Sequence, residues 1–245
     1  MIQNLNEKLW LNLPIDFHGI CMIYPMSIKQ YLHYKDVDAS DPNELQYDDI
    51  IVQFSFNHEF LHDNGIEYDG PMCDFFFMEP SMLQKMLWSI AVLTDDADIQ
   101  VDVANRRFVF QNGKCIDATN FDEFADIVLQ AHCFGRYEHV EKKMPKFRNK
   151  EHLKRWQRMQ AARAKYKPKD EVSIAQCIKT IQLESHSYIA DSEIATWSYW
   201  KLMHWYNAVV LQSNYEELHS CFAHWGGKNI RKSLDAMKKE LMTKI

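Results

Sequence analysis

The sequence predicts an α+β protein that is mainly α-helical, and three observations carry this prediction. Residues 80–94 place apolar side chains three and four positions apart, which is the spacing of one helix face. The period changes to two between Ile99 and Phe110, and Asn112-Gly113 is a favoured hairpin turn, so a small antiparallel β-meander is expected in the N-terminal half. Beyond residue 170 the apolar pattern is helical, which predicts a C-terminal helical bundle.

Short elements are expected before the long helix. Residues 3–13 predict a short helix that Pro14 ends, and residues 20–24 are apolar enough for a strand. Ser27 is the expected N-cap of the helix that follows. Residues 43–62 carry both helical and strand signals and end at the turn-forming Asp63-Asn64-Gly65.

The second half of the chain is expected to be helical on both sides of a basic stretch. Thr119 or Asn120 is the expected cap of a helix that reaches Ala131. Further helices are predicted over residues 172–184, 190–212, 214–222 and 228–243. These limits divide the chain into an N-terminal α+β domain (1–141), a basic helical connector (142–169) and a C-terminal helical domain (170–245).

Composition limits the class of protein. The chain has 245 residues, of which 47% are hydrophobic, so it has enough apolar surface for a sizeable core. Its six cysteines are scattered without a C-x-x-C pair, which favours reduced thiols in a cytosol over a disulfide framework. We expect no signal peptide and no membrane span, because no apolar run approaches the roughly 20 residues that a bilayer requires.

The connector differs sharply in charge from the rest of the chain. Between Lys142 and Lys169, twelve basic residues and one acid (Glu151) give a net charge of +11, whereas the other 16 basic and 33 acidic residues give −17. Leu153, Trp156 and Met159 lie three apart and form a narrow apolar stripe on the expected helix, with basic residues around it. The candidate partner contacts in this stretch are Leu153, Arg155, Trp156, Arg158 and Met159.

Three interpretations of the connector stay open. It is a solvated linker between domains, a docking arm for an acidic protein surface such as a second copy of this chain, or a nucleic-acid contact made through phosphates. The acidic remainder of the chain would repel nucleic acid, so we do not expect that partner.

One short string matches a metalloprotease motif. His58-Glu59-Phe60-Leu61-His62 has the H-E-x-x-H spacing, in which two histidines share a helix face and bind zinc while Glu59 acts as general base. The longer metzincin pattern requires a third histidine at the position of Tyr68, and the turn at Asp63 directly follows His62. We therefore expect a helix end with exposed histidines, no metal and no cofactor. A zinc-dependent hydrolase that uses His58, Glu59 and His62 is kept as an alternative.

The predicted helix over 190–212 is rich in aromatic side chains. Apolar groups cover more than half of its circumference, which is typical of a helix at the centre of a bundle or one that pairs with a partner. Core packing is the expected role. Trp197, Trp200 and Trp205 are nevertheless candidate partner contacts, because tryptophan is a frequent anchor in protein interfaces.

Three short segments occur in an order that identifies a resemblance. They are I-Y-P-M-S-I-K-Q-Y at 23–31, I-D-A-T-N-F-D-E-F at 116–124 and, after the basic stretch, A-T-W-S-Y-W-K-L at 195–202. In this order they resemble motifs of tail assembly chaperone-like proteins from long-tailed phages and prophages of Gram-positive bacteria.

The resemblance implies a non-catalytic assembly factor in the host cytoplasm. Such proteins keep the tape-measure protein soluble and help tail-tube subunits polymerise on it, so the implied partners are the tape-measure and tail-tube proteins. Self-association is a further expectation. The family has no catalytic residues to carry over to this chain. A nucleic-acid-binding accessory protein that uses the basic connector is kept as a second alternative.

Overall fold

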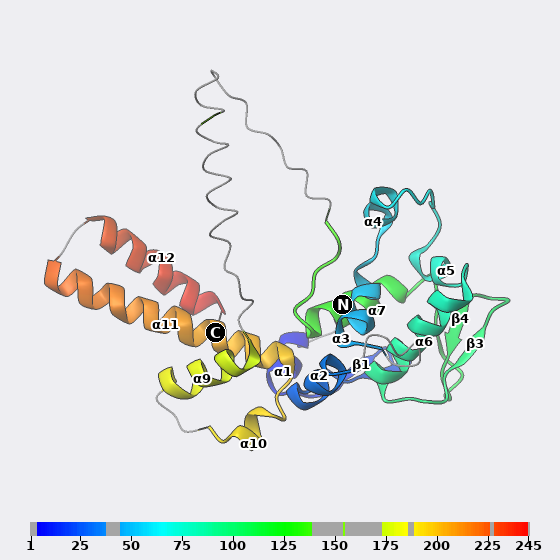
Figure 1. Cartoon of the computed structure of the whole chain (residues 1–245), viewed down its shortest axis with the longest axis horizontal. Helices are drawn as coiled ribbons and strands as arrows, with labels where there is room; N and C mark the ends of the chain where they lie inside the picture. The colour runs from blue at the N-terminus through cyan, green and yellow to red at the C-terminus, as the bar shows by residue number, and fades with distance from the viewer. Residues whose placement is uncertain are drawn as a thin grey trace.

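The structure, a computed structural model, describes residues 4–37, 45–138, 154, 173–185, 189–225 and 228–244. Over these residues the fold is α+β and mainly helical, as predicted. Both sheets lie in an N-terminal unit, and helix α11 runs away from that unit into a helical arm (Figure 1). In the basic connector only Lys154, which is helical and exposed, is described, so the candidates Leu153, Arg155, Trp156, Arg158 and Met159 lie outside the described residues.

The chain begins with a helix and a small β-hairpin. Helix α1 covers Leu5–Trp10, and strands β1 (Ile15–Phe17) and β2 (Cys21–Ile23) pair antiparallel. Strand β2 confirms the strand expected over 20–24, whereas its partner β1 was not predicted.

Helix α2 (Ile28–Lys35) begins at the predicted cap. The backbone N–H of Gln30 donates to the Ser27 hydroxyl at 3.2 Å, and the Ser27 N–H donates to the Gln30 side chain at 2.9 Å. This reciprocal capping box satisfies two amide groups that a helix start otherwise leaves without partners.

The middle of the N-terminal unit contains the predicted elements and one helix, α5, that was not predicted. The region with mixed signals is helical, in α3 (Tyr47–Val52), a 3-10 turn (Gln53–Ser55) and α4 (His58–Asp63). The further elements are α5 (Met72–Phe76), α6 (Pro80–Thr94), β3 (Gln100–Asp102), β4 (Arg107–Val109), β5 (Cys115–Ile116) and α7 (Phe121–Ala131). Strands β3, β4 and β5 form the expected antiparallel meander.

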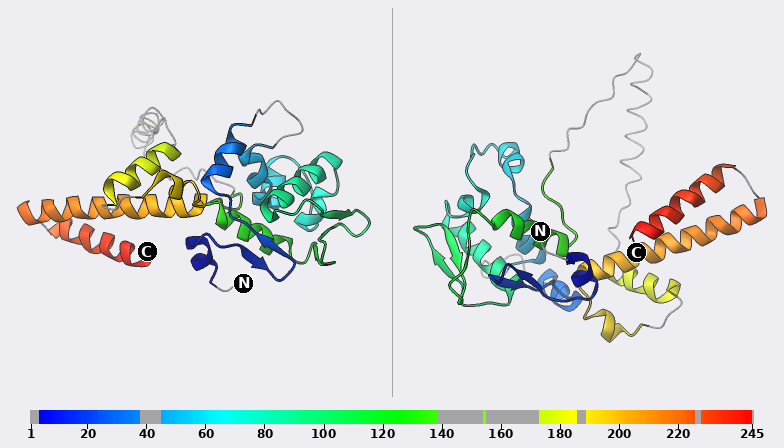
Figure 2. Two further views of the ribbon diagram at one scale, coloured as in Figure 1. Left: turned by 90° about the horizontal axis from the view of Figure 1, so that it is seen from below. Right: turned by 180° about the vertical axis from the view of Figure 1, so that it is seen from behind.

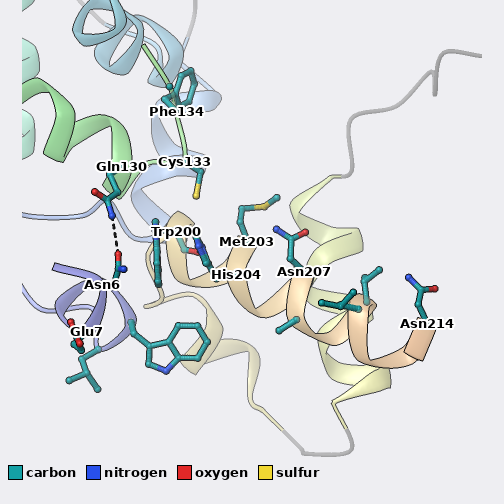
Figure 3. Close-up of a pocket in the computed structure, with 16 residues that line it drawn as sticks. Asn6, Glu7, Gln130, Cys133, Phe134, Trp200, Met203, His204, Asn207 and Asn214 are labelled. Atoms are coloured by element: carbon teal, nitrogen blue, oxygen red, sulfur yellow. Dashed lines mark hydrogen bonds between the residues drawn. The ribbon is translucent and has the colours of Figure 1, made fainter. Parts of the chain in front are cut away.

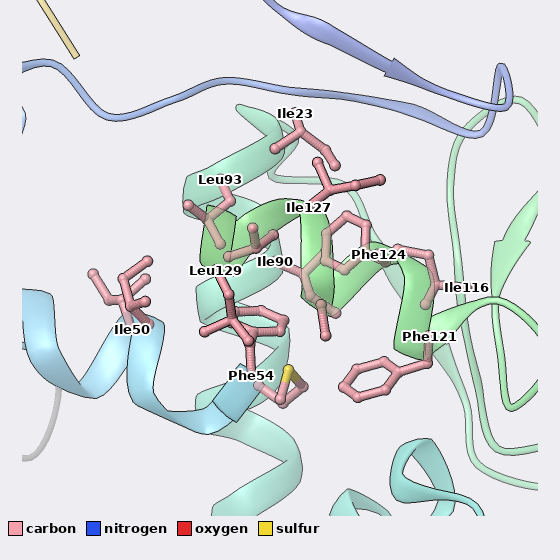
Figure 4. Packing of buried hydrophobic residues seen from close by; sticks show 14 of the residues in the cluster. Ile23, Ile50, Phe54, Ile90, Leu93, Ile116, Phe121, Phe124, Ile127 and Leu129 are labelled. Atoms are coloured by element: carbon pink, nitrogen blue, oxygen red, sulfur yellow. The ribbon is translucent and has the colours of Figure 1, made fainter. Parts of the chain in front are cut away.

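Aromatic side chains from distant segments meet at the centre of this unit (Figure 4). Phe124 of α7 lies edge-on to Phe17 of β1 and to Phe54, with ring centroids 5.3 and 5.8 Å apart. Phe121 lies beside Phe54 and Phe76. Each fully buried ring stabilises the fold by about 2 kcal/mol through removal of apolar surface from water. Because Phe121 and Phe124 contact rings from several other segments, α7 is the central helix of this core.

The C-terminal part differs from its prediction in one respect. The expected helices over 190–212 and 214–222 are replaced by α10 (Asp191–Ile194), a break, and one 27-residue helix, α11 (Tyr199–Trp225). At the break the Thr196 hydroxyl donates to the Glu193 carbonyl at 2.7 Å and competes with the helix backbone. No glycine or proline stands near Ser213 and Asn214, so nothing in the backbone ends α11 there.

Two helices flank α11. Helices α9 (Ile174–Glu184) and α12 (Lys228–Lys244) agree with the predicted helices over 172–184 and 228–243. Both contact α11, and they lie on different sides of it (Figure 2).

A backbone seam joins the helical part to the N-terminal unit. The N–H of Ile28 donates to the Trp197 carbonyl at 2.8 Å, and the N–H of Tyr199 donates to the Met26 carbonyl at 3.2 Å, around a bridge between Ser27 and Ser198. Side chains are exchanged across this seam. Ile28 is buried with Cys177, Ile181, Ile189, Ile194, Trp197 and Leu202, whereas Trp200 belongs to the N-terminal core. The predicted N-terminal and C-terminal domains therefore share buried residues.

Replacement of Ile28 by alanine tests the seam. We expect Ile28→Ala to lower the free energy of unfolding by about 3 kcal/mol, because it leaves a cavity between two packed units. Urea unfolding followed by circular dichroism measures this loss. Leu32→Ala, one turn along α2 and 44% exposed, is the matched control and should cost under about 1 kcal/mol. Equal losses for the two variants would contradict the shared packing.

Candidate functional site

A groove of about 1330 Å³ lies where α11 leaves the N-terminal unit (Figure 3). Helix α1 lines it on one side, and the end of α7 with the segment that follows lines it on another. Along its length the groove is lined by one face of α11: Trp200, Met203, His204, Asn207, Ala208, Val210, Leu211 and Asn214. None of these residues except Trp200 was among the sequence candidates.

The α11 face has a regular spacing and carries no charge. Trp200, Met203, Asn207, Val210 and Asn214 are separated by three, four, three and four residues, which is the spacing of a coiled-coil seam. From residue 202 to residue 215 the helix contains no Asp, Glu, Lys or Arg. This absence of charge over a 3-4 stripe is the sequence signal that could have identified the groove.

Other faces of α11 are used within the chain. Leu202 packs in the cluster with α9, and Val209 is buried. Asn207 and Asn214 are exposed, and Met203 and Val210 are only half-buried. Met203 also packs against the cluster with α9, whereas the two asparagines keep the stripe accessible. Helix α11 is therefore packed on some of its sides and partly open along this one.

Tryptophans anchor the inner end of the groove. Trp10 of α1 stacks on Trp205 at 6.1 Å and meets Trp200 edge-on at 6.0 Å, and Trp197 stacks on Trp205 at 5.8 Å. The Lys201 ammonium lies 4.7 Å from the centre of the Trp197 ring. The three tryptophan candidates are therefore brought together. Trp197 and Trp200 are buried and Trp205 is half-buried, so they mainly hold α1 and the start of α11 together.

The wall formed by the end of α7 has a defined geometry. The N–H of Phe134 donates to the Leu129 carbonyl at 2.9 Å, and the N–H of Cys133 donates to the Gln130 carbonyl at 3.2 Å, which is a Schellman helix end. Cys133 takes the left-handed conformation, with φ of +58°, that usually belongs to glycine at this position. The Gln130 amide also donates to Asn6 of α1 at 2.9 Å and joins two walls of the groove (Figure 3).

A buried histidine stands behind this wall. His132 is fully buried, and its Nδ1 lies in hydrogen-bonding distance of the Tyr47 hydroxyl, at 3.1 Å. Its Nε2 is buried without a hydrogen-bond partner among the described residues. Burial lowers the pKa of His132 to about 3, so the ring is neutral at ordinary pH, and burial raises the pKa of Tyr47.

The H-E-x-x-H residues lie on α4, away from the groove lining. As expected, α4 ends at Asp63, directly after the second histidine. The His58 ring donates from Nε2 to the Gly70 carbonyl at 3.0 Å, and the His62 side chain is 90% exposed beside Asp63. Glu59 lies between them in the same helix. Within the described ranges, no three His, Cys, Asp or Glu side chains gather as a metal site would require.

Substitution of His132 should change how stability depends on pH. The unfolded chain protonates this histidine near pH 6.5, whereas the folded protein does so only near pH 3. The stability that the protein owes to a neutral His132 is therefore complete above about pH 6.5 and is lost as pH falls from there toward 3. We expect His132→Asn, which keeps a polar group facing Tyr47, to reduce the steepness of this loss by about one proton in urea unfolding between pH 7 and 4.

Tyr47→Phe is the matched control for this pH series. It removes the hydroxyl beside His132 but leaves the histidine buried, so it should lower stability at every pH and keep the steepness of the parent protein. Identical steepness in the parent and in His132→Asn would refute the neutral buried ring.

Neither the known protein families nor the curated proteins nor the solved structures yielded a match to this chain. No helix in the described part of the chain combines the length and apolar character that crossing a bilayer demands.

Proposed function

We propose that this chain is a non-catalytic assembly chaperone that holds a helical segment of a client protein in the α11 groove. The observation that carries the proposal is the uncharged 3-4 stripe of α11, which lines the groove and whose Asn207 and Asn214 are exposed. Apolar anchors at this spacing are how proteins bind an amphipathic helix in a groove.

The size and lining of the groove support a macromolecular client. Small-molecule pockets usually enclose about 300–1,000 Å³ around a few converging polar groups. This groove is larger, and among the described residues that line it Glu7 of α1 is the only Asp, Glu, Lys or Arg. A long hydrophobic floor with amides at intervals suits a helix better than a substrate that must be oriented for a reaction.

The resemblance to phage tail assembly chaperone-like proteins supplies the client. In this proposal the tape-measure protein contributes the helix, the tail-tube protein is the second partner, and assembly takes place in the host cytoplasm. The stretch from Lys142 to Lys169, with its net charge of +11, acts in the same proposal as a reversible docking arm. No contact of the described residues favours the zinc-hydrolase or nucleic-acid alternatives over this one.

Co-expression with tape-measure fragments tests the client. A tape-measure gene encoded beside this chain should yield a fragment that co-purifies with the full-length protein. Val210→Asp places a charge on the open stripe and should reduce capture at least tenfold, because a docked helix would bury that charge without a partner.

Val103→Asp is the matched control. Val103 is 62% exposed beside the β-meander and lies outside the groove lining, so the same change there should leave capture intact. Circular dichroism of both variants checks that they are folded. A gene neighbourhood without tail genes, or equal capture by both variants, would overturn the proposal.

A further inference from the structure

Two amide side chains interrupt the apolar stripe of α11 at a regular interval. Asn207 and Asn214 both line the groove and stand seven residues apart (Figure 3). Asn207 lies between Met203 and Val210 in the stripe, and Asn214 follows the half-buried Leu211. Neither amide makes a hydrogen bond to another described residue. Both are exposed, so in the free protein water satisfies them at little cost.

The situation changes when a helix occupies the groove. Seven residues are two turns of a coiled-coil helix, so Asn207 and Asn214 occupy equivalent seam positions on successive heptads. A docked helix removes water from the α11 stripe. Each amide must then find a polar partner on the incoming helix or remain buried without one, which is strongly unfavourable.

We propose that Asn207 and Asn214 select the client and fix its register, and that the occupant is one amphipathic helix with amide side chains seven residues apart. A buried asparagine in a coiled-coil seam sets register and partner choice at a cost in affinity. The floor from Trp200 to Asn214 spans about 21 Å at 1.5 Å per residue, so about four turns of client are read. This inference rests on the proposed helix-binding function and names the chemistry of its partner.

Charge and access determine the rest of the client. The uncharged floor gives no partner for a charged seam residue, so the seam facing α11 must be uncharged. The inner end of the groove lies between α1 and the segment after α7. A second copy of α11 would bring its own α9 and α12 beside it, whereas a single client helix enters without flanking helices.

Synthetic helical peptides test the selection. Two labelled 21-residue peptides carry leucines at the other seam positions and either asparagine or leucine at two positions seven apart. Fluorescence anisotropy with the full-length protein should show about tenfold tighter binding of the asparagine peptide, because leucine leaves two buried amides unpaired. The double variant Asn207→Leu with Asn214→Leu should reverse this preference.

Gln212→Leu is the matched control. Gln212 lies on the same helix outside the groove lining, where its amide donates to Glu216 at 3.0 Å, so its substitution should leave the asparagine preference unchanged. Circular dichroism checks the fold of each variant. Equal binding of both peptides by the parent, or binding of neither, would overturn the selection by Asn207 and Asn214.

The remaining outcomes separate this inference from the proposed function. Capture of a tape-measure fragment together with equal peptide binding would reject the amide register and leave the chaperone function standing. An asparagine preference without capture of any tape-measure fragment would do the reverse. Sedimentation showing a dimer that Val210→Asp dissociates would identify a second copy as the occupant and overturn the single client helix.

Discussion

The exchange of two buried side chains holds the candidate site together. Ile28 of α2 is buried among the C-terminal helices, and Trp200 of α11 is buried in the N-terminal core. Backbone hydrogen bonds between Met26–Ile28 and Trp197–Tyr199 hold together the two segments that carry these side chains. The first turn of α11 is thereby held against α1 and the end of α7, which supply the walls of the groove. Without this seam, α11 would have an open face but no walls beside it.

Helix α11 can leave an apolar stripe open because packing stabilises its other sides. Helices α9 and α12 pack along it, and the tryptophan cluster around Trp205 ties its start to α1. A helix in a folded protein gains most of its stability from tertiary packing, so α11, which packs against two neighbouring helices, does not need a third. Asn207 and Asn214 keep the open stripe hydrated, which limits non-specific association of an otherwise apolar surface.

Local signals were enough to predict much of the fold but little of the site. Helix α6 begins and ends at the predicted residues because Pro80 suits a first helical turn and the apolar period is unbroken. The Ser27 cap depends only on a residue three positions away. The groove depends on α1 and α11, which are nearly 190 residues apart, and no local pattern reports that contact. The H-E-x-x-H string is a local pattern that matches a known motif, but its spacing does not reveal that His58 bonds Gly70.

Trp200 contributes both to the packing that joins the two units and to the lining of the groove. Its ring is buried in the N-terminal core and meets Trp10 edge-on, yet it also lines the inner end of the groove. A helix docked in the groove would contact the side chain that joins α11 to the N-terminal unit. Binding that requires the intact seam stabilises it, since a ligand favours the state to which it binds. In the proposed function, client occupancy and the joining of the two units would therefore be coupled at Trp200.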